Sequence, residues 1–289
     1  MVVRRVLLDA FGTIFSPREP VHVQYAAVAR SYGLLVEDVQ VKTAFKDAFK
    51  LQAQRHPLYG KRSRPPLEPS EWWATVILDT FRGAGISEAQ LTPIAGKLST
   101  ELVERFWGAA GYDLHGDVEP FLRALHSLPC PPSGSAHSTA WNSSSSFPAP
   151  VVVSNTDPAV VKILDSLGVL ENRFEIRQAG IREDQVFTTW QLEEDKKEVR
   201  FWDEVLRRLR RDEPDLSPNE VLVIGDELVS DYKTPRLAGY RTLLLRRDLA
   251  NGEHARASYD DEKAGPAVVD TVRDLVEVAD LIRRENAVP

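Results

Sequence analysis

An aspartate closes the first apolar run of the chain and is placed to act as a nucleophile. Asp9 directly follows the run at residues 2–8, and Gly12 comes three residues later. A buried strand that ends at an acid and then turns presents the acid at its carboxyl end, where open α/β sheets build their sites. Gly12 lets the backbone pass close to a substrate. We therefore predict that Asp9 is the nucleophile and that Gly12 lies beside the substrate.

Polar side chains also follow two later apolar runs, at residues 151–153 and 221–224. A further polar residue lies at the start of the helix predicted between these two runs. These residues are Ser154, Asn155, Lys196, Asp226 and Asp231. If the strands lie side by side, their carboxyl ends bring Asp9, Ser154 and Asp226 into one crevice. Lys196, at the mouth of the intervening helix, can reach the same crevice.

This set of groups is suited to phosphoryl transfer. Carboxylates from two strands form a hard oxygen site of the kind that binds Mg²⁺. The Ser154 hydroxyl and the Lys196 ammonium would bind the equatorial oxygens of a transferring phosphoryl group, where charge stabilisation supplies most of the catalysis. Attack by the Asp9 carboxylate on phosphorus would give an aspartyl-phosphate, which water then cleaves.

The hydropathy pattern changes along the chain. Residues 20–110 have helix-like spacing with almost no strand signal, which indicates an inserted helical unit. Trp72 and Trp73 fall in this unit, where we expect them to pack. Beyond residue 150, short apolar runs alternate with helical segments, which predicts a parallel sheet covered on both faces. The predicted fold class is α/β, a Rossmann-like doubly wound parallel sheet with an inserted all-helical cap.

We place the core domain at residues 1–15 and 113–289 and the helical cap at residues 16–112. Opening and closing of such a cap would control water access and select the substrate. A Ser- and Pro-rich stretch at residues 129–150 has the composition of a flexible surface loop inserted in the core.

Composition and net charge exclude some classes of binding partner and indicate a cellular compartment. The chain has 289 residues, 43% of them hydrophobic, and a formal charge of −7, so we expect no general attraction to nucleic acid or to anionic membranes. The single cysteine, Cys130, excludes an internal disulfide and fits a reducing compartment. No run is long enough to span a bilayer. We expect a cytoplasmic protein that acts on a small molecule; its oligomeric state stays open.

Taken in order, these motifs resemble those of the haloacid dehalogenase (HAD) superfamily of aspartate-nucleophile hydrolases. The matching residues are Asp9-Ala10-Phe11-Gly12-Thr13, Ser154-Asn155, Lys196, and Gly225-Asp226 with Asp231. The resemblance extends to the subgroup named haloacid dehalogenase-like hydrolase domain-containing protein 3. It implies catalysis by Asp9, Ser154 and Lys196, and substrate contacts from Gly12, Thr13 and Asn155. It also implies Mg²⁺ held by Asp9, Asp226, Asp231 and the backbone carbonyl of Phe11.

The chain departs from the superfamily pattern at two positions. Phosphatases of the superfamily carry a second aspartate, the general acid, where this chain has Phe11. Because positioned acid–base catalysis is worth roughly 10²- to 10⁴-fold, plain monoesters should be poor substrates, and good leaving groups should suffer less. The motif lysine is followed by Lys197 where proline is usual. Aligning Trp202 with the aromatic residue that the superfamily carries six places after its lysine selects Lys196, and Lys197 remains a competitor.

We therefore expect a Mg²⁺-dependent hydrolase that acts on a small phosphorylated metabolite through Asp9. One alternative is a catalytically weak or inactive HAD-fold protein that binds a ligand or partner. Another is a 2-haloacid dehalogenase, since dehalogenases of the superfamily resemble this chain in having an aromatic residue at the position of Phe11. The pattern of Asp226 and Asp231 favours phosphoryl chemistry, because a dehalogenase has no use for Mg²⁺.

Overall fold

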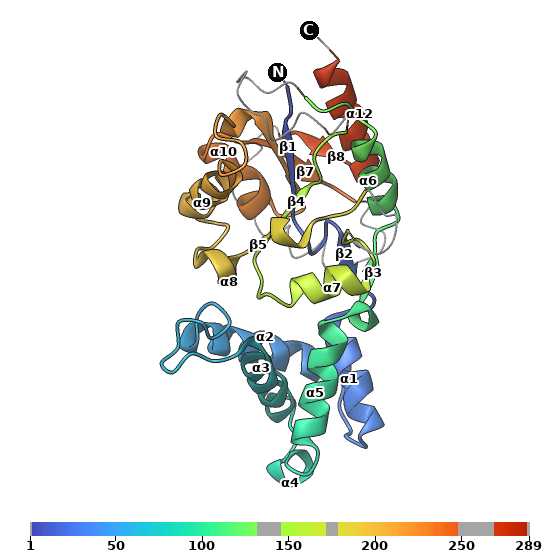
Figure 1. The fold of residues 1–289 in the computed structure, drawn as a ribbon. Helices are drawn as coiled ribbons and strands as arrows, with labels where there is room; N and C mark the ends of the chain where they lie inside the picture. The colour runs from blue at the N-terminus through green and yellow to red at the C-terminus, as the bar shows by residue number, and fades with distance from the viewer. Residues whose placement is uncertain (1, 132–145, 172–178, 248–268, 288–289) are drawn as a thin grey trace. The chain divides into compact units, whose positions relative to one another are not determined.

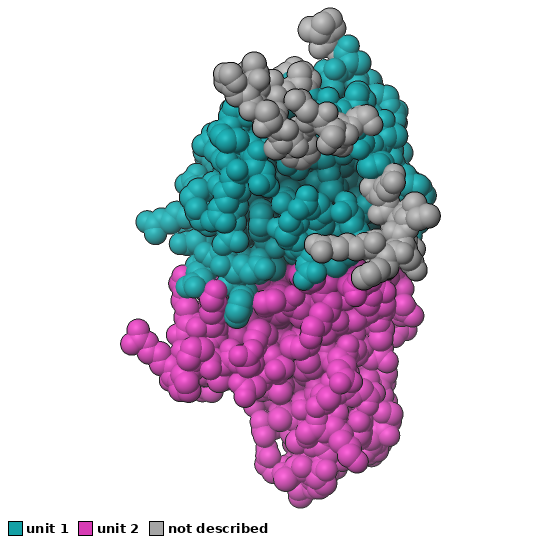
Figure 2. Space-filling model, in the orientation of Figure 1, with its two compact units in different colours: residues 1–16, 114–155, 168–289 teal, residues 17–113, 156–167 magenta. Residues whose placement is uncertain are grey.

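A computed structural model describes residues 2–131, 146–171, 179–247 and 269–287 of the chain (Figure 1). Most of the predicted flexible loop, residues 132–145, lies outside these ranges. The chain divides into two compact units, coloured separately in Figure 2. The first consists of Met1–Ser16, Leu114–Asn155 and Gly168–Pro289, and the second of Pro17–Asp113 and Thr156–Leu167.

The first unit is built on a sheet of six parallel strands. They are β1 (Arg5–Leu8), β4 (Val151–Ser154), β5 (Val186–Thr188), β6 (Val221–Gly225), β7 (Arg241–Leu245) and β8 (Thr271–Val272). Their order is β5-β4-β1-β6-β7-β8, and every neighbouring pair is parallel. On one side of β1 lie β4 and then β5, and on its other side lie β6, β7 and β8 in that order. The order therefore reverses between β1 and β6, the place where doubly wound sheets bind ligands.

Helices cover both faces of this sheet, which confirms the predicted fold class (Figure 1). They are α6 (Val118–His126), α8 (Thr189–Leu192), α9 (Val199–Leu209), α10 (Thr234–Leu237) and α12 (Leu275–Asn286). The amphipathic stripe of α9 packs Phe201, Trp202 and Val205 against sheet residues that include Leu7 and Val223. Both faces of the central strands are covered, so their residues form continuous apolar runs without alternation.

The helix predicted after β6 is irregular at its start. A π-helix, η5 (Leu228–Lys233), precedes the single turn of α10. Asp231 lies inside this wide turn and is buried. Turns of this kind often occur at functional sites, because they aim a side chain that a regular helix would direct elsewhere.

The second unit is largely helical. Its helices are α1 (Val21–Ser31), α2 (Asp38–Arg55), α3 (Pro69–Gly83), α4 (Glu88–Leu91), α5 (Ala95–Phe106) and α7 (Val160–Ser166). Tyr25, Phe81 and Leu98 belong to its main apolar core. The chain passes between the units through β2 (Phe15–Pro17) and β3 (Tyr112–Leu114), which pair with each other. Residues 156–167, which the sequence analysis placed in the core domain, belong to this helical unit.

None of the helices in the described ranges combines the length and the apolar character needed to cross a membrane.

Candidate active site

The two strands at the centre of the sheet bring the first and fourth motifs together. β1 and β6 pair in parallel with Leu8 opposite Ile224, so Asp9 and Asp226 both follow the same edge of the sheet. The Asp9 amide continues the ladder by donating to the carbonyl of Ile224 at 2.9 Å. The predicted nucleophile therefore lies at the switch point of the fold.

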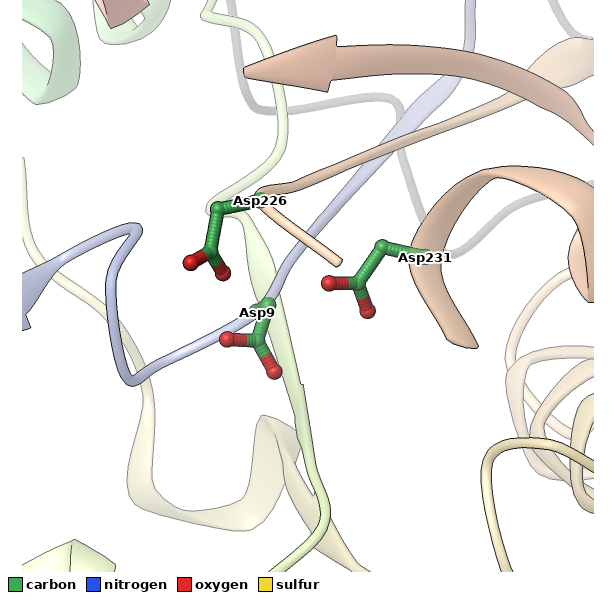
Figure 3. A group of neighbouring side chains, drawn as sticks. All are labelled: Asp9, Asp226 and Asp231. Atoms are coloured by element: carbon green, nitrogen blue, oxygen red, sulfur yellow. The ribbon is translucent and has the colours of Figure 1, made fainter. Parts of the chain in front are cut away.

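Three carboxylates gather there (Figure 3). Asp9, Asp226 and Asp231 each offer an oxygen within 4.8 Å of the others. Two glycines make room for them. A Cβ at Gly12, whose φ is +80°, would lie 2.2 Å from Asp226 Oδ2, and one at Gly225 would lie 2.3 Å from the Asp231 carboxyl carbon. Gly12 of the first motif is thus required by Asp226, and Gly225 of the fourth motif by Asp231.

Lys196 is buried among these acids. Its Nζ lies 2.5 Å from Asp9 Oδ1 and 2.5 Å from Asp231 Oδ1, and it donates to the Val153 carbonyl at 3.0 Å. The side chain is only 1% exposed, whereas Lys197 is an exposed residue. Of the two candidate lysines, the structure therefore brings Lys196 to the predicted nucleophile.

The backbone of Lys196 is fixed from both sides. Its amide donates to Asn155 Oδ1 at 3.0 Å, and its carbonyl accepts from the Trp202 indole at 2.9 Å. Asn155 also donates to Asp195 Oδ1 at 3.3 Å. Asn155, predicted to bind substrate, therefore acts in this structure on the position of the lysine. The six-residue spacing to Trp202 that singled out Lys196 corresponds to a direct hydrogen bond.

Two hydroxyl groups of the predicted site have no hydrogen-bond partner among the described residues. Ser154 Oγ, at the end of β4, and Thr13 Oγ1, in the loop after β1, are both buried and unpaired. A buried hydroxyl without a partner costs stability, which is expected where a ligand supplies the missing bond. One hydroxyl at the end of β4 and one in the loop after the neighbouring strand β1 fit donors for a bound anion.

Phe11 occupies the position at which the resemblance to the HAD superfamily implies a second acid in phosphatases. Its ring meets that of Phe15 edge to face, with 4.8 Å between the centroids. No titratable group is thus supplied by this position.

The sequence motifs also missed Arg247, whose guanidinium donates to the Thr13 carbonyl at 2.7 Å and to Asp117 at 2.8 Å. Arg247 braces the loop after β1, and no spacing in the sequence indicates it.

Comparison with known proteins agrees with this geometry. A HAD-hydrolase-like family model matches residues 195–275. Haloacid dehalogenase-like hydrolase domain-containing protein 3 from Bos taurus is 30% identical over 244 residues, which cover 84% of this chain and 82% of the relative. This chain belongs to the HAD-like hydrolases. The Mus musculus protein of the same name is 27% identical and covers 98% of the chain and 96% of the relative. The family predicted from the motifs is therefore confirmed.

Solved structures show the same HAD-like fold. The L-2-haloacid dehalogenase PA0810 aligns with a TM-score of 0.58 at 16% identity, covering 98% of this chain and 99% of the other. The putative HAD-hydrolase YfnB from Bacillus subtilis, described as bound to magnesium, aligns at 0.56 and 17% identity, covering 98% and 99%. These similarities establish the fold. The reaction has to be inferred from the residues of the candidate active site.

The acid cluster of this HAD-like hydrolase carries more carboxylates than nearby cations. Burial raises the pKa of Asp9 to about 7, although the Lys196 ammonium acts against the shift. Burial, together with the Asp9 and Asp231 carboxylates, raises the pKa of Asp226 well above its ordinary value. For Lys196 burial lowers the pKa, but the attraction of Asp231 and Asp9 outweighs it and the pKa is raised. The lysine therefore stays charged while two of the acids resist ionisation.

A divalent cation fits this donor set. Asp226 Oδ1 is buried without a hydrogen-bond partner among the described residues, and its carboxylate lies with those of Asp9 and Asp231, whose oxygens are hard ligands. Asp231 is less free, since its Oδ1 pairs with Lys196 and its Oδ2 accepts the Glu227 amide at 3.0 Å. Asp226 and Asp9 are therefore the residues best placed to contact a metal directly, with Asp231 behind them.

Proposed function

We propose that this chain is a divalent-metal-dependent hydrolase that transfers a phosphoryl group from a small phosphorylated molecule to Asp9. The observation that carries the proposal is the buried Oδ1 of Asp226, which has no hydrogen-bond partner among the described residues and lies in a cluster of three carboxylates. Such a group costs stability unless a cation completes it. The magnesium described for YfnB, which shares the fold, supports Mg²⁺ as that cation.

The side chains suggest a two-step reaction. An Asp9 oxygen forms a bond to phosphorus while the bond from phosphorus to the leaving oxygen breaks. Water then attacks the phosphorus of the aspartyl-phosphate, releasing phosphate and restoring Asp9. Lys196 keeps its proton throughout, orients Asp9 and offsets its charge. The hydroxyls of Ser154 and Thr13 donate to the phosphoryl oxygens. A Mg²⁺ ion held by Asp9 and Asp226, with Asp231 and the Phe11 carbonyl implied by the family pattern, would offset charge on the phosphoryl group.

Leaving groups decide which substrates turn over. The position of the general acid holds Phe11, packed against Phe15, so the departing oxygen must leave without a proton from that side chain. Acyl phosphates, aryl phosphates and phosphoanhydrides release stable anions and tolerate this loss. Alkyl monoesters should be slower by roughly 10²- to 10⁴-fold.

The experiment is hydrolysis of acetyl phosphate and an aryl phosphate with and without Mg²⁺. We expect metal-dependent phosphate release that Asp9→Asn abolishes and that Asp165→Asn, a surface carboxylate change on α7, leaves intact. Wild-type turnover no higher than that of Asp9→Asn would refute the proposal and favour a binding protein.

Dehalogenation is the second candidate, and one observation favours it. Phe11 is aromatic, as in dehalogenases of the superfamily, and a halide leaves without needing a proton. The buried acid cluster speaks against it, because displacement of a halide by Asp9 gains nothing from two further carboxylates. Chloride release from a 2-haloacid without metal would reverse this preference.

A further inference from the structure

The chain leaves the first unit directly after a residue of the candidate site. It passes into the helical unit between Asn155 and Thr156 and returns between Leu167 and Gly168. This crossing is separate from the one at β2 and β3. The helical unit is therefore joined by a single peptide bond to Asn155, the residue whose side chain holds the Lys196 amide.

A hydrogen bond to a buried carboxylate attaches residues 156–167 inside the helical unit. Asp157 is 2% exposed, and its Oδ2 accepts from the Trp73 indole of α3 at 2.7 Å. Its Oδ1 accepts from the Ala159 amide at 2.7 Å, which fixes the start of the turn leading into α7. A second contact places the Lys162 ammonium over the Trp107 ring, 4.9 Å from its centroid. Residues 156–167 are thus attached to the helical unit by specific groups as well as by packing.

The other end of the same segment holds the lysine. The Val153 carbonyl accepts from Lys196 Nζ at 3.0 Å, and Asn155 Oδ1 accepts from the Lys196 amide at 3.0 Å. The strap formed by residues 153–157 therefore has the active-site lysine bound at one end and Trp73 bound at the other. Any displacement of Asp157 is passed through two peptide units to Asn155.

We propose that Trp73 and Asp157 are positioning residues for Lys196, acting through this strap. Their hydrogen bond holds Asp157 in place, and through the two peptide units that follow it toward Asn155 it sets the position of the Asn155 side chain against the Lys196 amide. A catalytic role for Lys196 rests on the proposed function; the mechanical link itself does not.

The two adjacent tryptophans of α3 provide a matched test. Trp73→Phe keeps the ring packing and removes the N–H that binds Asp157. Trp72→Phe removes an N–H that donates to the His56 carbonyl at 2.8 Å, inside residues 17–113. Trp72 is also the more deeply buried of the pair, so the control is at least as disruptive to packing.

The readout is hydrogen exchange by mass spectrometry on the full chain, without substrate or metal. In Trp73→Phe we expect exchange at the Lys196 amide to rise by about tenfold, because the bond to Asn155 opens more often. In Trp72→Phe it should stay at the wild-type rate. Equal rates at Lys196 in the two variants would overturn the proposal. In active preparations Trp73→Phe should lower kcat with KM little changed.

A second variant keeps the test decisive if Trp73→Phe does not fold. Asp157→Asn retains one side-chain oxygen for two donors, so the same change at Lys196 is expected at smaller size, and wild-type exchange there would overturn the proposal. Because exchange is measured without turnover, an inactive wild-type protein would refute the proposed function and leave this inference standing.

Discussion

Binding of Mg²⁺ should release a proton in a strongly pH-dependent way. Burial places the pKa of Asp9 at about 7 in the metal-free protein. The protonated acid is therefore the favoured form below that value, and its proton must leave before the carboxylate can contact a cation. With a pKa of about 7, Asp9 carries roughly 0.9 proton at pH 6 and roughly 0.1 at pH 8. The affinity for Mg²⁺ thus rises with pH.

The size of this effect follows from the same shift. From Asp9 alone the apparent association constant should increase about tenfold between pH 6 and pH 8, or about 1.4 kcal/mol. Asp226, whose pKa is also raised, steepens the dependence. Calorimetric titration with Mg²⁺ in two buffers of different ionisation enthalpy counts the released protons directly. Asp9→Asn should remove the part due to Asp9. Binding at pH 6 with no proton release would refute the assignment of Asp9 to the metal site.

Three further changes test individual parts of the site. Gly12→Ala puts a methyl group on the Asp226 carboxylate at a positive φ, and should cost about 1–3 kcal/mol in urea unfolding and weaken Mg²⁺ binding; a wild-type Kd would contradict this. Lys196→Met leaves two buried carboxylates without their cation, so the free energy of unfolding at pH 8 should fall by about 3–5 kcal/mol and recover partly at pH 5, where Asp9, whose pKa is raised to about 7, is protonated. An equal loss at both pH values would mean that the lysine matters only for packing. Phe11→Asp should raise kcat/KM for alkyl monoesters by roughly 10²- to 10⁴-fold and for aryl phosphates far less; equal gains would show that no proton was missing.

The sequence predicted the structure best at strands that belong to the core of the sheet and are also followed by residues of the candidate site. The runs that became β1, β4 and β6 are buried on both faces and end in polar groups, so their adjacency and the gathering of Asp9 and Asp226 were predictable. The strands β5 and β8 were missed because they have only three and two residues, too few to form a recognisable run.

Other features depend on tertiary contacts that leave no local pattern. Lys196 and Lys197 stand in one charged stretch, where the alignment of Trp202 favoured Lys196 but left Lys197 open, and the contacts of the Lys196 ammonium with Asp9 and Asp231 decide between them. Likewise, the sequence pattern predicts that the segment 156–167 is a helix of the core domain. Its attachment to the helical unit depends on Trp73, which lies more than eighty residues earlier in the chain.

The site has side chains suited to nucleophilic attack, but Phe11 stands where a proton donor for the leaving group would be needed. Asp226 has a buried oxygen without a partner among the described residues, and Asp9 resists ionisation. Both features lower stability, so a fold maintained only for packing would gain from replacing these residues. In the proposed function, a metal and an electrophile would offset these costs. Phe11, by contrast, packs well against Phe15 and supplies no proton. Nucleophilic attack is therefore supported by the geometry while departure of the leaving group is not assisted, which makes the stability of the leaving anion the main determinant of which substrates react.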